Sequence, residues 1–557
     1  MIENKKINRL AIIFICIASL LSMFLVFFSS SQKKQISEPE YAQKIFGQEI
    51  ISVEILADEK EWGDMIQNAN KENFIKADVI VNGTSFKNVG IRPKGNSSLS
   101  QVTALKSERY SLRLQFDEYV TDQTCFGLDS FVLNNMITDN SYMKEYLSYD
   151  LMKDIGIQTP YFGYATIKLN GVNSGLYLAV ETYGKSYETR INGNTSGKMY
   201  NVKSMDMAKN DKDKNPETLQ PPPQENNDQK KPNQAPGGNS PKMQRETKGG
   251  DLKYTDDDIS SYSNIFDNVV GKATNSDFKK IIKALKNLSE GNNLEKYFDI
   301  DSTLKYLAAH TVVVNLDSYS SSMAQNYYLY EYKSKITVLP WDYNMAWGGF
   351  QSKDSSSVVN FPIDTPVSGI EMSDRPLINQ LLSNPDYLEK YHEYLAKILD
   401  SYFDNGKLEA KIDELNNRIS KLVKEDPTKF CTFEEYKKSV ETLKELALLR
   451  AQSIEGQLSN TIPSTTSEQA KSPEKLIDST NINLSDLGNG FGHKREDIND
   501  GVANSQQNRP PTPPNNFHST QSSSNVSQNF DSYKLPSILI IFTLLITFLV
   551  MNYRRNF

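Results

Sequence analysis

Three oxygen-bearing side chains in one central stretch of the chain could bind a divalent cation. Asp317 ends an apolar run, Asn326 opens the alternating strand NYYLY, and Asp342 follows a second apolar run at 336–339. The short turn between these strands predicts a β-hairpin, which brings its outer ends together, so that Asp317 or Asn326 can lie near Asp342. Converging carboxylate and amide oxygens suit a hard cation such as Mg²⁺, which in proteins usually also binds substrate phosphates.

An Asp at the end of a strand is, however, more often a turn or capping residue that hydrogen-bonds to nearby backbone. The surroundings of Asp342 depart from that ordinary case because three bulky aromatic residues lie beside it in the sequence: Trp341, Tyr343 and Trp347. A carboxylate held among aromatic side chains needs a polar partner, and a metal ion is one candidate. The combination of residues, and not any single Asp, favours a cation site.

A donor-rich loop in the N-terminal half is a candidate anion-binding segment. The dipeptide Asn82-Gly83 is a strong hairpin signal, and the strand that returns from it leads into PKGNSS at 93–98. This loop can offer backbone N–H groups to an anion. An ordinary polar turn is the alternative interpretation of the same composition.

Three charged residues lie on predicted elements of the same half. Arg113 lies on a strand that alternates apolar and polar residues. Glu145 falls in the first turns of an amphipathic helix at 141–155, away from its apolar stripe, so we expect a solvated or helix-dipole residue. Glu181 closes a second hairpin, which is built around Asn170-Gly171.

The distribution of elements predicts two unlike lobes. Strands and one helix dominate residues 40–203, and helices dominate 251–458, where only the hairpin at 326–339 interrupts them. Residues 204–250 are rich in Pro, Asn, Gln and Lys and predict a disordered insertion, and the Ser-, Asn-, Gln- and Pro-rich residues 459–534 predict a flexible stalk. The expected fold class is α+β, with a β-rich N-lobe, an α-rich C-lobe and carboxylates at the seam, one layout that binds nucleotide and Mg²⁺.

Both ends of the chain carry apolar segments. Residues 10–28 follow a basic start, so that 1–31 predicts a signal peptide or an uncleaved signal anchor. Residues 535–552 predict a transmembrane helix, and Arg554 and Arg555 behind it favour a cytoplasmic C-terminus. With both ends inside, we expect a protein tethered to the cell membrane, with the region between them on the extracytoplasmic side.

Composition argues against two classes of function. A net charge of −7 disfavours a general nucleic-acid binder, so no nucleic-acid partner is expected. The four His residues are scattered and no CxxC pattern occurs, which disfavours a zinc site. Cys125 and Cys431 could form one disulfide, since the third cysteine lies in the apolar N-terminal segment.

Five motifs follow one another along the chain in a specific order, although any one of them alone would be a weak signal. They are IRPKGNSSL at 91–99, LNN at 133–135 with YMKEYLSYD at 142–150, GLYLAVE at 175–181, NYYLY at 326–330 and PWDYN at 340–344. In these motifs the sequence resembles the CotH kinase family. The resemblance runs from about 53 to 458, apart from the insertion.

The resemblance implies an atypical, bilobal protein-kinase-like fold and transfer of phosphate from ATP to Ser or Thr of surface or spore-coat proteins. Asp342 takes the place of the Mg²⁺-binding Asp of kinases, and Asn326 would be a second metal ligand. Asp317 takes the place of the catalytic Asp that accepts or orients the substrate hydroxyl. Positioning and charge neutralisation supply most of the catalysis in such a transfer.

The same resemblance assigns the nucleotide-binding residues. The segment that ends at Glu181 looks like the connection between the lobes, where adenine would sit. Glu145 would pair with the catalytic basic residue that touches the phosphates, which is either Lys94 or Arg113. Arg is not equivalent to Lys there, because it is always charged and can fork onto a phosphate. Four consecutive loop residues would cover the phosphates: Lys94, Gly95, Asn96 and Ser97.

Two functions remain as hypotheses. The first is an exported, ATP- and Mg²⁺-dependent protein kinase with a Ser/Thr-rich protein substrate, for which its own stalk is a candidate, for example at 464–467 or 522–524. The second is a non-catalytic surface or coat-assembly protein that uses the same fold as a binding module. The membrane segments, the stalk and the need for ATP outside the cell support the second hypothesis, because a fold alone does not establish a function.

Overall fold

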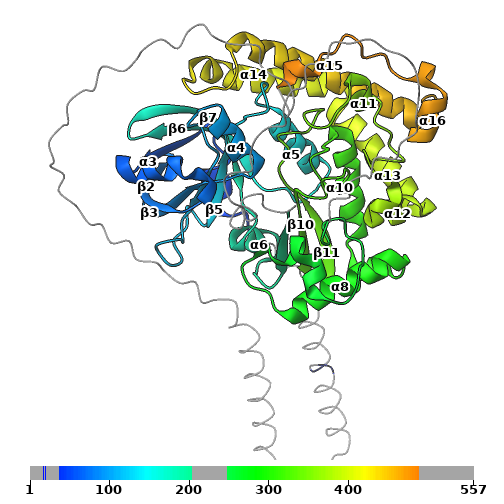
Figure 1. The fold of residues 1–557 in the computed structure, drawn as a ribbon, viewed down its shortest axis with the longest axis horizontal. Coiled ribbons are helices and arrows are strands. Elements are labelled where there is room, and N and C mark those ends of the chain that lie inside the picture. Colours follow the sequence, from blue (N-terminus) through cyan, green and yellow to red (C-terminus); the bar gives the residue numbers. More distant parts are fainter. Residues whose placement is uncertain (1–16, 18, 20–36, 204–246, 489–557) are drawn as a thin grey trace, which may run out of the picture. The chain divides into compact units, whose positions relative to one another are not determined.

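A closed β-barrel followed by a mainly helical region makes up the described part of the chain (Figure 1). The computed structural model describes residues 17, 19, 37–203 and 247–488. Strands and helices are both abundant in these ranges, which confirms the predicted α+β class.

The barrel has the strand order β1-β2-β3-β4-β5-β7-β6 and is closed by the parallel pairing of β1 with β6. Its two predicted tight turns are confirmed: Asn82-Gly83 and Asn170-Gly171 have positive φ, as a type I′ hairpin turn requires. Apolar side chains that alternate along the strands fill the interior. The strands are β1 (Ile51–Leu56), β2 (Ile75–Val81), β3 (Thr84–Pro93), β4 (Leu112–Gln115), β5 (Ser130–Asn134), β6 (Phe162–Leu169) and β7 (Val172–Glu181).

A second sheet contains the predicted central hairpin. Strands β10 (Tyr327–Tyr332) and β11 (Lys335–Pro340) pair antiparallel with Tyr327 opposite Pro340, which confirms the hairpin. The sheet order is β11-β10-β8-β9, with β8 (Lys198–Val202) and β9 (Val269–Val270). Strand β8 falls in the range expected for the first lobe, but it pairs with β10 of the second. Sequence periodicity carries no information on such a distant partner.

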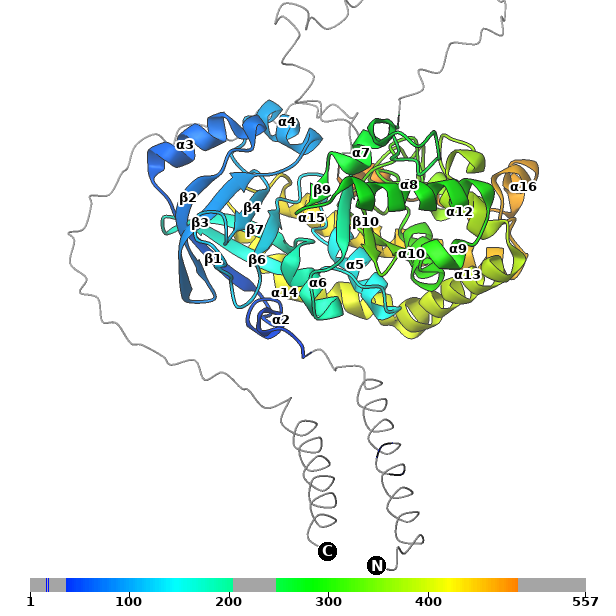
Figure 2. The ribbon, with the colours of Figure 1, turned by 90° about the horizontal axis from the view of Figure 1, so that it is seen from below.

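Helix α5 (Lys144–Asp154) lies between the barrel and the helical region (Figures 1 and 2). It contacts β6 on one side and α10 (Ile300–Val313) on the other. Because neighbours cover it on more than one side, polar residues such as Glu145 and Ser148 are buried together with the apolar stripe.

The other long helices form where apolar periodicity predicted them, but two predicted helix boundaries need correction. Asp299, and not Asp301, caps α10 through a hydrogen bond from Ser302 N. The single helix expected at 376–403 is interrupted, because the Asn384 side chain caps a new helix that starts at Pro385. The helices are α8 (Asn275–Glu290), α12 (Pro376–Leu382), α13 (Pro385–Ile398), α14 (Lys407–Glu425) and α15 (Phe433–Leu458).

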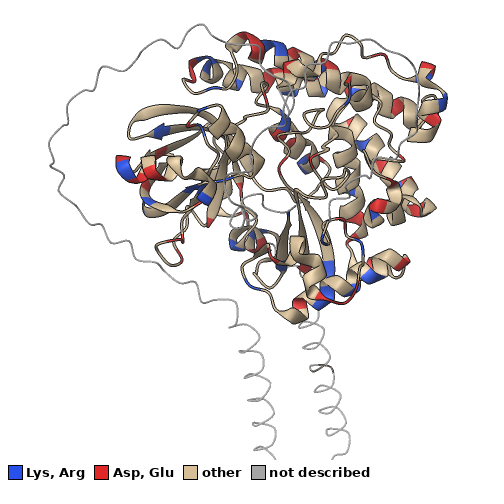
Figure 3. Cartoon of the chain, viewed as in Figure 1, with Lys and Arg blue, Asp and Glu red and all other residues tan. Residues whose placement is uncertain are grey.

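Charged residues of both signs are interspersed on the outer helices in Figure 3, as the i,i+4 ion pair between Arg418 and Glu414 on α14 illustrates.

The two cysteines that could have formed a disulfide, Cys125 and Cys431, are both buried and are not bonded to each other. The thiol of Cys431 instead donates to the Asn140 carbonyl, at 3.8 Å. The sequence left this disulfide open as a possibility, and the structure shows both cysteines as free thiols.

Residues 459–488 correct the prediction of a stalk that starts at 459. This segment contains helix α16 (Thr466–Lys471), and its residues Ile462, Ile482 and Leu487 are buried. A few widely spaced apolar side chains anchor it, although its overall composition is polar. The rest of the predicted stalk, most of the insertion and the predicted terminal membrane segments lie outside the described residues, apart from residues 17 and 19. None of the helices that the structure describes has the length and apolarity to cross a membrane.

Candidate active site

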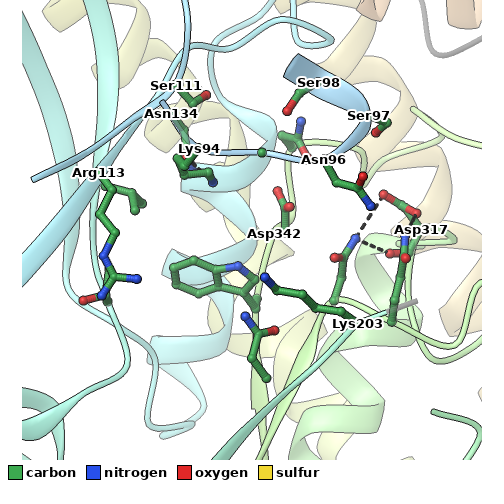
Figure 4. A pocket seen from close by; sticks show the side chains of 18 of the residues that line it. Lys94, Asn96, Ser97, Ser98, Ser111, Arg113, Asn134, Lys203, Asp317 and Asp342 are labelled. Carbon is green, nitrogen blue, oxygen red and sulfur yellow. Dashed lines mark hydrogen bonds between the residues drawn. The ribbon is translucent and has the colours of Figure 1, made fainter. Parts of the chain in front are cut away.

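A pocket of about 470 Å³ lies where the end of the barrel meets the second sheet. Eight of the predicted site residues line it, from both halves of the chain: Lys94, Gly95, Asn96, Ser97, Arg113, Asp317, Asn326 and Asp342. Figure 4 labels all of these except Gly95 and Asn326. Two predicted residues do not line the pocket, Glu145 and Glu181. The sequence therefore located this pocket from residues that lie far apart along the chain.

Asp317 lies in the segment between α10 and β10, and Asp342 lies just after β11. Asp317 accepts hydrogen bonds from Gln325 Nε2 at 2.7 Å and from Asn326 Nδ2 at 3.0 Å (Figure 4). Because the Asn326 nitrogen is used in this way, its Oδ1 is the atom that can bind a cation. Burial, together with the negative charge of Asp342, raises the pKa of Asp317 to about 7.

The backbone at Asp342 is held in the left-handed region, with φ of 63°. This conformation costs a non-glycine residue on the order of 1 kcal/mol and persists where neighbouring bonds enforce it. Here the N–H of Asp342 donates to the Tyr149 hydroxyl at 3.2 Å, and its carbonyl accepts from Asn315 Nδ2 at 3.2 Å. These bonds aim the carboxylate into the pocket (Figure 4).

Glu145 reaches the pocket residues through an intermediary that sequence analysis missed. Its carboxylate accepts from Asn134 Nδ2 at 2.8 Å, and Asn134 Oδ1 accepts from Lys94 Nζ at 2.9 Å. Glu145 is only 1% exposed, so the expectation of a solvated residue is wrong. Burial, and then the charge of Asp342, raises the pKa of Glu145 to about 7, while Lys94 opposes the shift.

Four basic residues line the pocket, and two of them, Arg92 and Lys203, were not predicted as site residues. Figure 4 labels the other two, Lys94 and Arg113, together with Lys203. Lys94 Nζ lies 5.8 Å from the centre of the Trp341 ring as well as bonding Asn134. Arg113 donates to Gln115 Oε1 at 2.8 Å, and burial lowers its pKa, as does the neighbouring charge of Arg92. Lys203 immediately follows β8, whose distant pairing hid it from sequence reasoning.

The predicted anion-binding loop turns directly into helix α4 (Ser97–Ala104). The first N–H groups of a helix have no partner within the helix, and its N-terminus favours negative charge. Gly95 has φ of 139°, and a Cβ there would overlap the Ser98 hydroxyl, so this position requires glycine. The segment thus places the backbone donors of a helix N-terminus beside the Lys94 ammonium.

Glu181 is buried and holds the local fold instead of facing the pocket. Its carboxylate accepts from Tyr41 Oη at 2.7 Å, from Tyr161 N at 2.9 Å and from Arg190 at 2.7 Å. The next two residues, Thr182 and Tyr183, line the pocket. Glu181, predicted to contact a nucleotide, therefore does not line the pocket, whereas these two neighbours do.

The Asp342 carboxylate and the Asn326 amide fit Mg²⁺ better than a metal that is enclosed by protein ligands. Among the residues that the structure describes, no group of three or more His, Cys, Asp or Glu side chains could hold a metal ion. Mg²⁺ is commonly held by one or two carboxylates plus substrate phosphates. Asp342 and Asn326, with Asp317 beside them and basic groups for phosphates nearby, meet that requirement.

Comparison with known proteins identifies a family whose match covers all five sequence motifs described above. The family described as "CotH kinase protein" matches residues 91–454, which contain every predicted site residue. Inner spore coat protein H of Bacillus subtilis (strain 168) is 24% identical over 370 residues, a match that covers 65% of this chain and 85% of that protein. Since the family match spans more than half of the chain, this protein belongs to the CotH kinase family.

Proposed function

We propose that the protein is a kinase that transfers the γ-phosphoryl group of ATP to a Ser or Thr hydroxyl of a protein. The observation that carries this proposal is that Asp317 and Asp342 line one pocket with Lys94, which comes from the barrel. Family membership supports phosphoryl transfer as the chemistry. In this proposal the barrel and the helical region act as the two lobes of a kinase-like fold.

The phosphates of ATP bind at the start of α4. Backbone N–H groups of Asn96 and Ser97 and the ammonium of Lys94 provide donors. Lys94 is the stronger candidate for the phosphate-binding cation, because it connects through Asn134 to Glu145, whereas Arg113 is bonded to Gln115. Arg113 and Lys203 neutralise further charge in the same pocket.

The adenine ring is placed against the aromatic wall next to Thr182. Tyr183 and Trp341 lie there with ring centres 5.6 Å apart. Asp342 and Asn326 would hold Mg²⁺, which when bound neutralises charge on the phosphate oxygens.

Asp317 is the proposed proton acceptor. Its carboxylate lines the pocket and is oriented by hydrogen bonds from Gln325 and Asn326, so it can accept the proton of a hydroxyl that binds there. The hydroxyl oxygen of the acceptor bonds to the γ-phosphorus while the bond from that phosphorus to the bridging oxygen breaks. ADP leaves, and the hydroxyl proton passes to Asp317.

The acceptor is proposed to be a surface or spore-coat protein, because a relative is named as a spore coat protein. The stalk of this chain offers fewer candidate hydroxyls for self-phosphorylation than its sequence suggested. The hydroxyl of Ser464 donates to Asp364 at 2.6 Å, and Thr465 caps α16 by accepting from Glu468 N. These two hydroxyls have structural partners, so self-phosphorylation is proposed at 522–524, which lies outside the described residues.

Radiolabelled ATP tests the proposal with the full-length protein in mild detergent and a Ser/Thr-rich acceptor peptide. Wild type should label the peptide only with Mg²⁺ present, and Asp342→Ala should reduce labelling to background. The control Asp301→Asn removes an acid from the surface of α10 and should label normally. Labelling by Asp342→Ala would refute the assigned role, and nucleotide binding without transfer by wild type would support the non-catalytic binding module.

A further inference from the structure

One buried side chain connects the backbones of the two acidic residues. Asn315 is completely buried, its Oδ1 accepts from the Asp317 N–H at 3.2 Å, and its Nδ2 donates to the Asp342 carbonyl at 3.2 Å. The Asn315 side-chain oxygen is therefore bonded to the segment of Asp317, and its side-chain nitrogen to the segment of Asp342. A change in either bond would alter the separation of the two carboxylates.

A second connection runs behind the first, through His310. The hydroxyls of Ser318 and Ser320 donate to the Asn315 carbonyl, so each can only accept from the imidazole. Nε2 of His310 lies 2.9 Å from both hydroxyl oxygens and must carry the proton. Nδ1 then accepts from the hydroxyl of Tyr343, at 2.9 Å, in the residue that follows Asp342.

The imidazole is suited to this connection because it is neutral and fixed in orientation. Burial lowers the pKa of His310 to about 4. The Tyr306 ring stacks on it, with ring centres 5.5 Å apart. Charge therefore plays no part in the connection at neutral pH, and hydrogen-bond geometry alone determines it.

The backbone beside Asn315 is strained in a way that calls for such bonds. Val314 has φ of 47°, which is rare for a β-branched residue, and Asp342 has φ of 63°. Such conformations persist where the surroundings enforce them, and they concentrate at functional sites. The Asn315 side-chain amide hydrogen-bonds to Asp342, one of these strained residues. Asn315 itself directly follows Val314, the other strained residue.

We propose that Asn315, supported by His310, is a positioning residue that holds Asp342 for binding of a divalent metal with its nucleotide and sets its separation from the proton acceptor, Asp317. This inference rests on the proposed function. Neither Asn315 nor His310 lines the pocket, so they act through the residues that do. A purely structural role is the alternative, and metal affinity separates the two because folding stability alone does not change it.

Electron paramagnetic resonance of Mn²⁺, in the presence of a non-hydrolysable ATP analogue, measures that affinity on the full-length protein. Asn315→Ala should raise the Mn²⁺ dissociation constant by about tenfold or more, the usual effect of losing a residue that orients a metal ligand. It should also lower kcat while KM for the acceptor peptide stays unchanged. The matched control is Asn360→Ala, since Asn360 is also buried and bonds Ser356 and Ile477 away from the pocket. That variant should lose stability but retain the wild-type dissociation constant.

Tyr343→Phe is the milder variant, which removes only the hydroxyl bound to His310. It should raise the dissociation constant in the same direction by a smaller factor, and it decides the question where Asn315→Ala does not fold. Wild-type binding of Mn²⁺ and nucleotide, with unchanged affinity in folded Asn315→Ala and in Tyr343→Phe, would overturn this inference alone. If wild type binds no Mn²⁺ with the nucleotide, the proposed function fails and this inference fails with it.

Discussion

Arg109 donates from its guanidinium to the Asp426 carboxylate at 2.7 Å, and both side chains are completely buried. Arg109 precedes β4 of the barrel, and Asp426 follows α14 of the helical region. The same guanidinium donates to the carbonyls of Asn135 and Leu176. One residue thus joins the barrel to the helices and bonds Asn135, the residue that follows Asn134, which contacts Lys94 and Glu145.

Breaking this pair should be far more costly than breaking a surface pair. Asp426→Asn leaves a buried guanidinium without its counter-charge, so the free energy of unfolding should fall by about 3–5 kcal/mol. Glu434→Gln removes a pair with Lys437 in which the side chains are 79% and 52% exposed, and it should cost less than about 1 kcal/mol. Urea unfolding measured side by side compares them. Equal losses would contradict a structural role for the buried pair.

The bridging amide of Asn134 should be required for activity. Asn134→Ala removes both the acceptor for Lys94 and the donor for Glu145, so Lys94 loses the contact that fixes its position. We expect kcat/KM for ATP to fall on the order of 100-fold, the effect of a misplaced catalytic group. Steady-state kinetics with labelled ATP measures the change. Asn287→Ala, on the exposed side of α8, is the control and should be indistinguishable from wild type.

The buried imidazole of His310 should make the protein less stable in mild acid. Burial lowers its pKa to about 4, whereas an unfolded His titrates near 6.5. Between these values the unfolded chain binds more protons than the native one, so stability is fully present above pH 6.5 and is lost as the pH falls towards 4. The full loss is on the order of 3 kcal/mol. The titratable rings that face His310 are Tyr306 and Tyr343, whose pKa values are raised, so both stay neutral throughout this range.

Urea unfolding at pH 7.5 and pH 5 measures this dependence. His310→Gln should be less stable than wild type at pH 7.5, but its stability should fall less on acidification. The other His that the structure describes, His392, is present in both proteins and cancels in the comparison. A wild-type protein whose unfolding midpoint falls no more than that of His310→Gln would contradict the prediction.

Local patterns predicted the elements, and non-local contacts explain what was missed. The hairpin that leads to Asp342 and the turn at Asn82-Gly83 depend on residues close together in the sequence, so alternation and turn chemistry were sufficient. The burial of Glu145 depends on which elements surround α5, which no helical periodicity specifies. Lys203 entered the pocket through the pairing of β8 with β10, which depends on residues more than a hundred positions apart.

The segment after α15 offers the last prediction, because its sequence suggested a stalk and its packing does not. Ile462 is 6% exposed, and its N–H donates to the Gly456 carbonyl at 2.9 Å. Ile462→Ala should therefore lower the free energy of unfolding by about 2–4 kcal/mol, as truncation of a buried Ile does. Val172→Ala, at a position that is 69% exposed, should change it by less than about 0.5 kcal/mol. Urea denaturation of both variants tests the packing, and an Ile462→Ala midpoint equal to that of Val172→Ala would restore the stalk interpretation for residues 459–488.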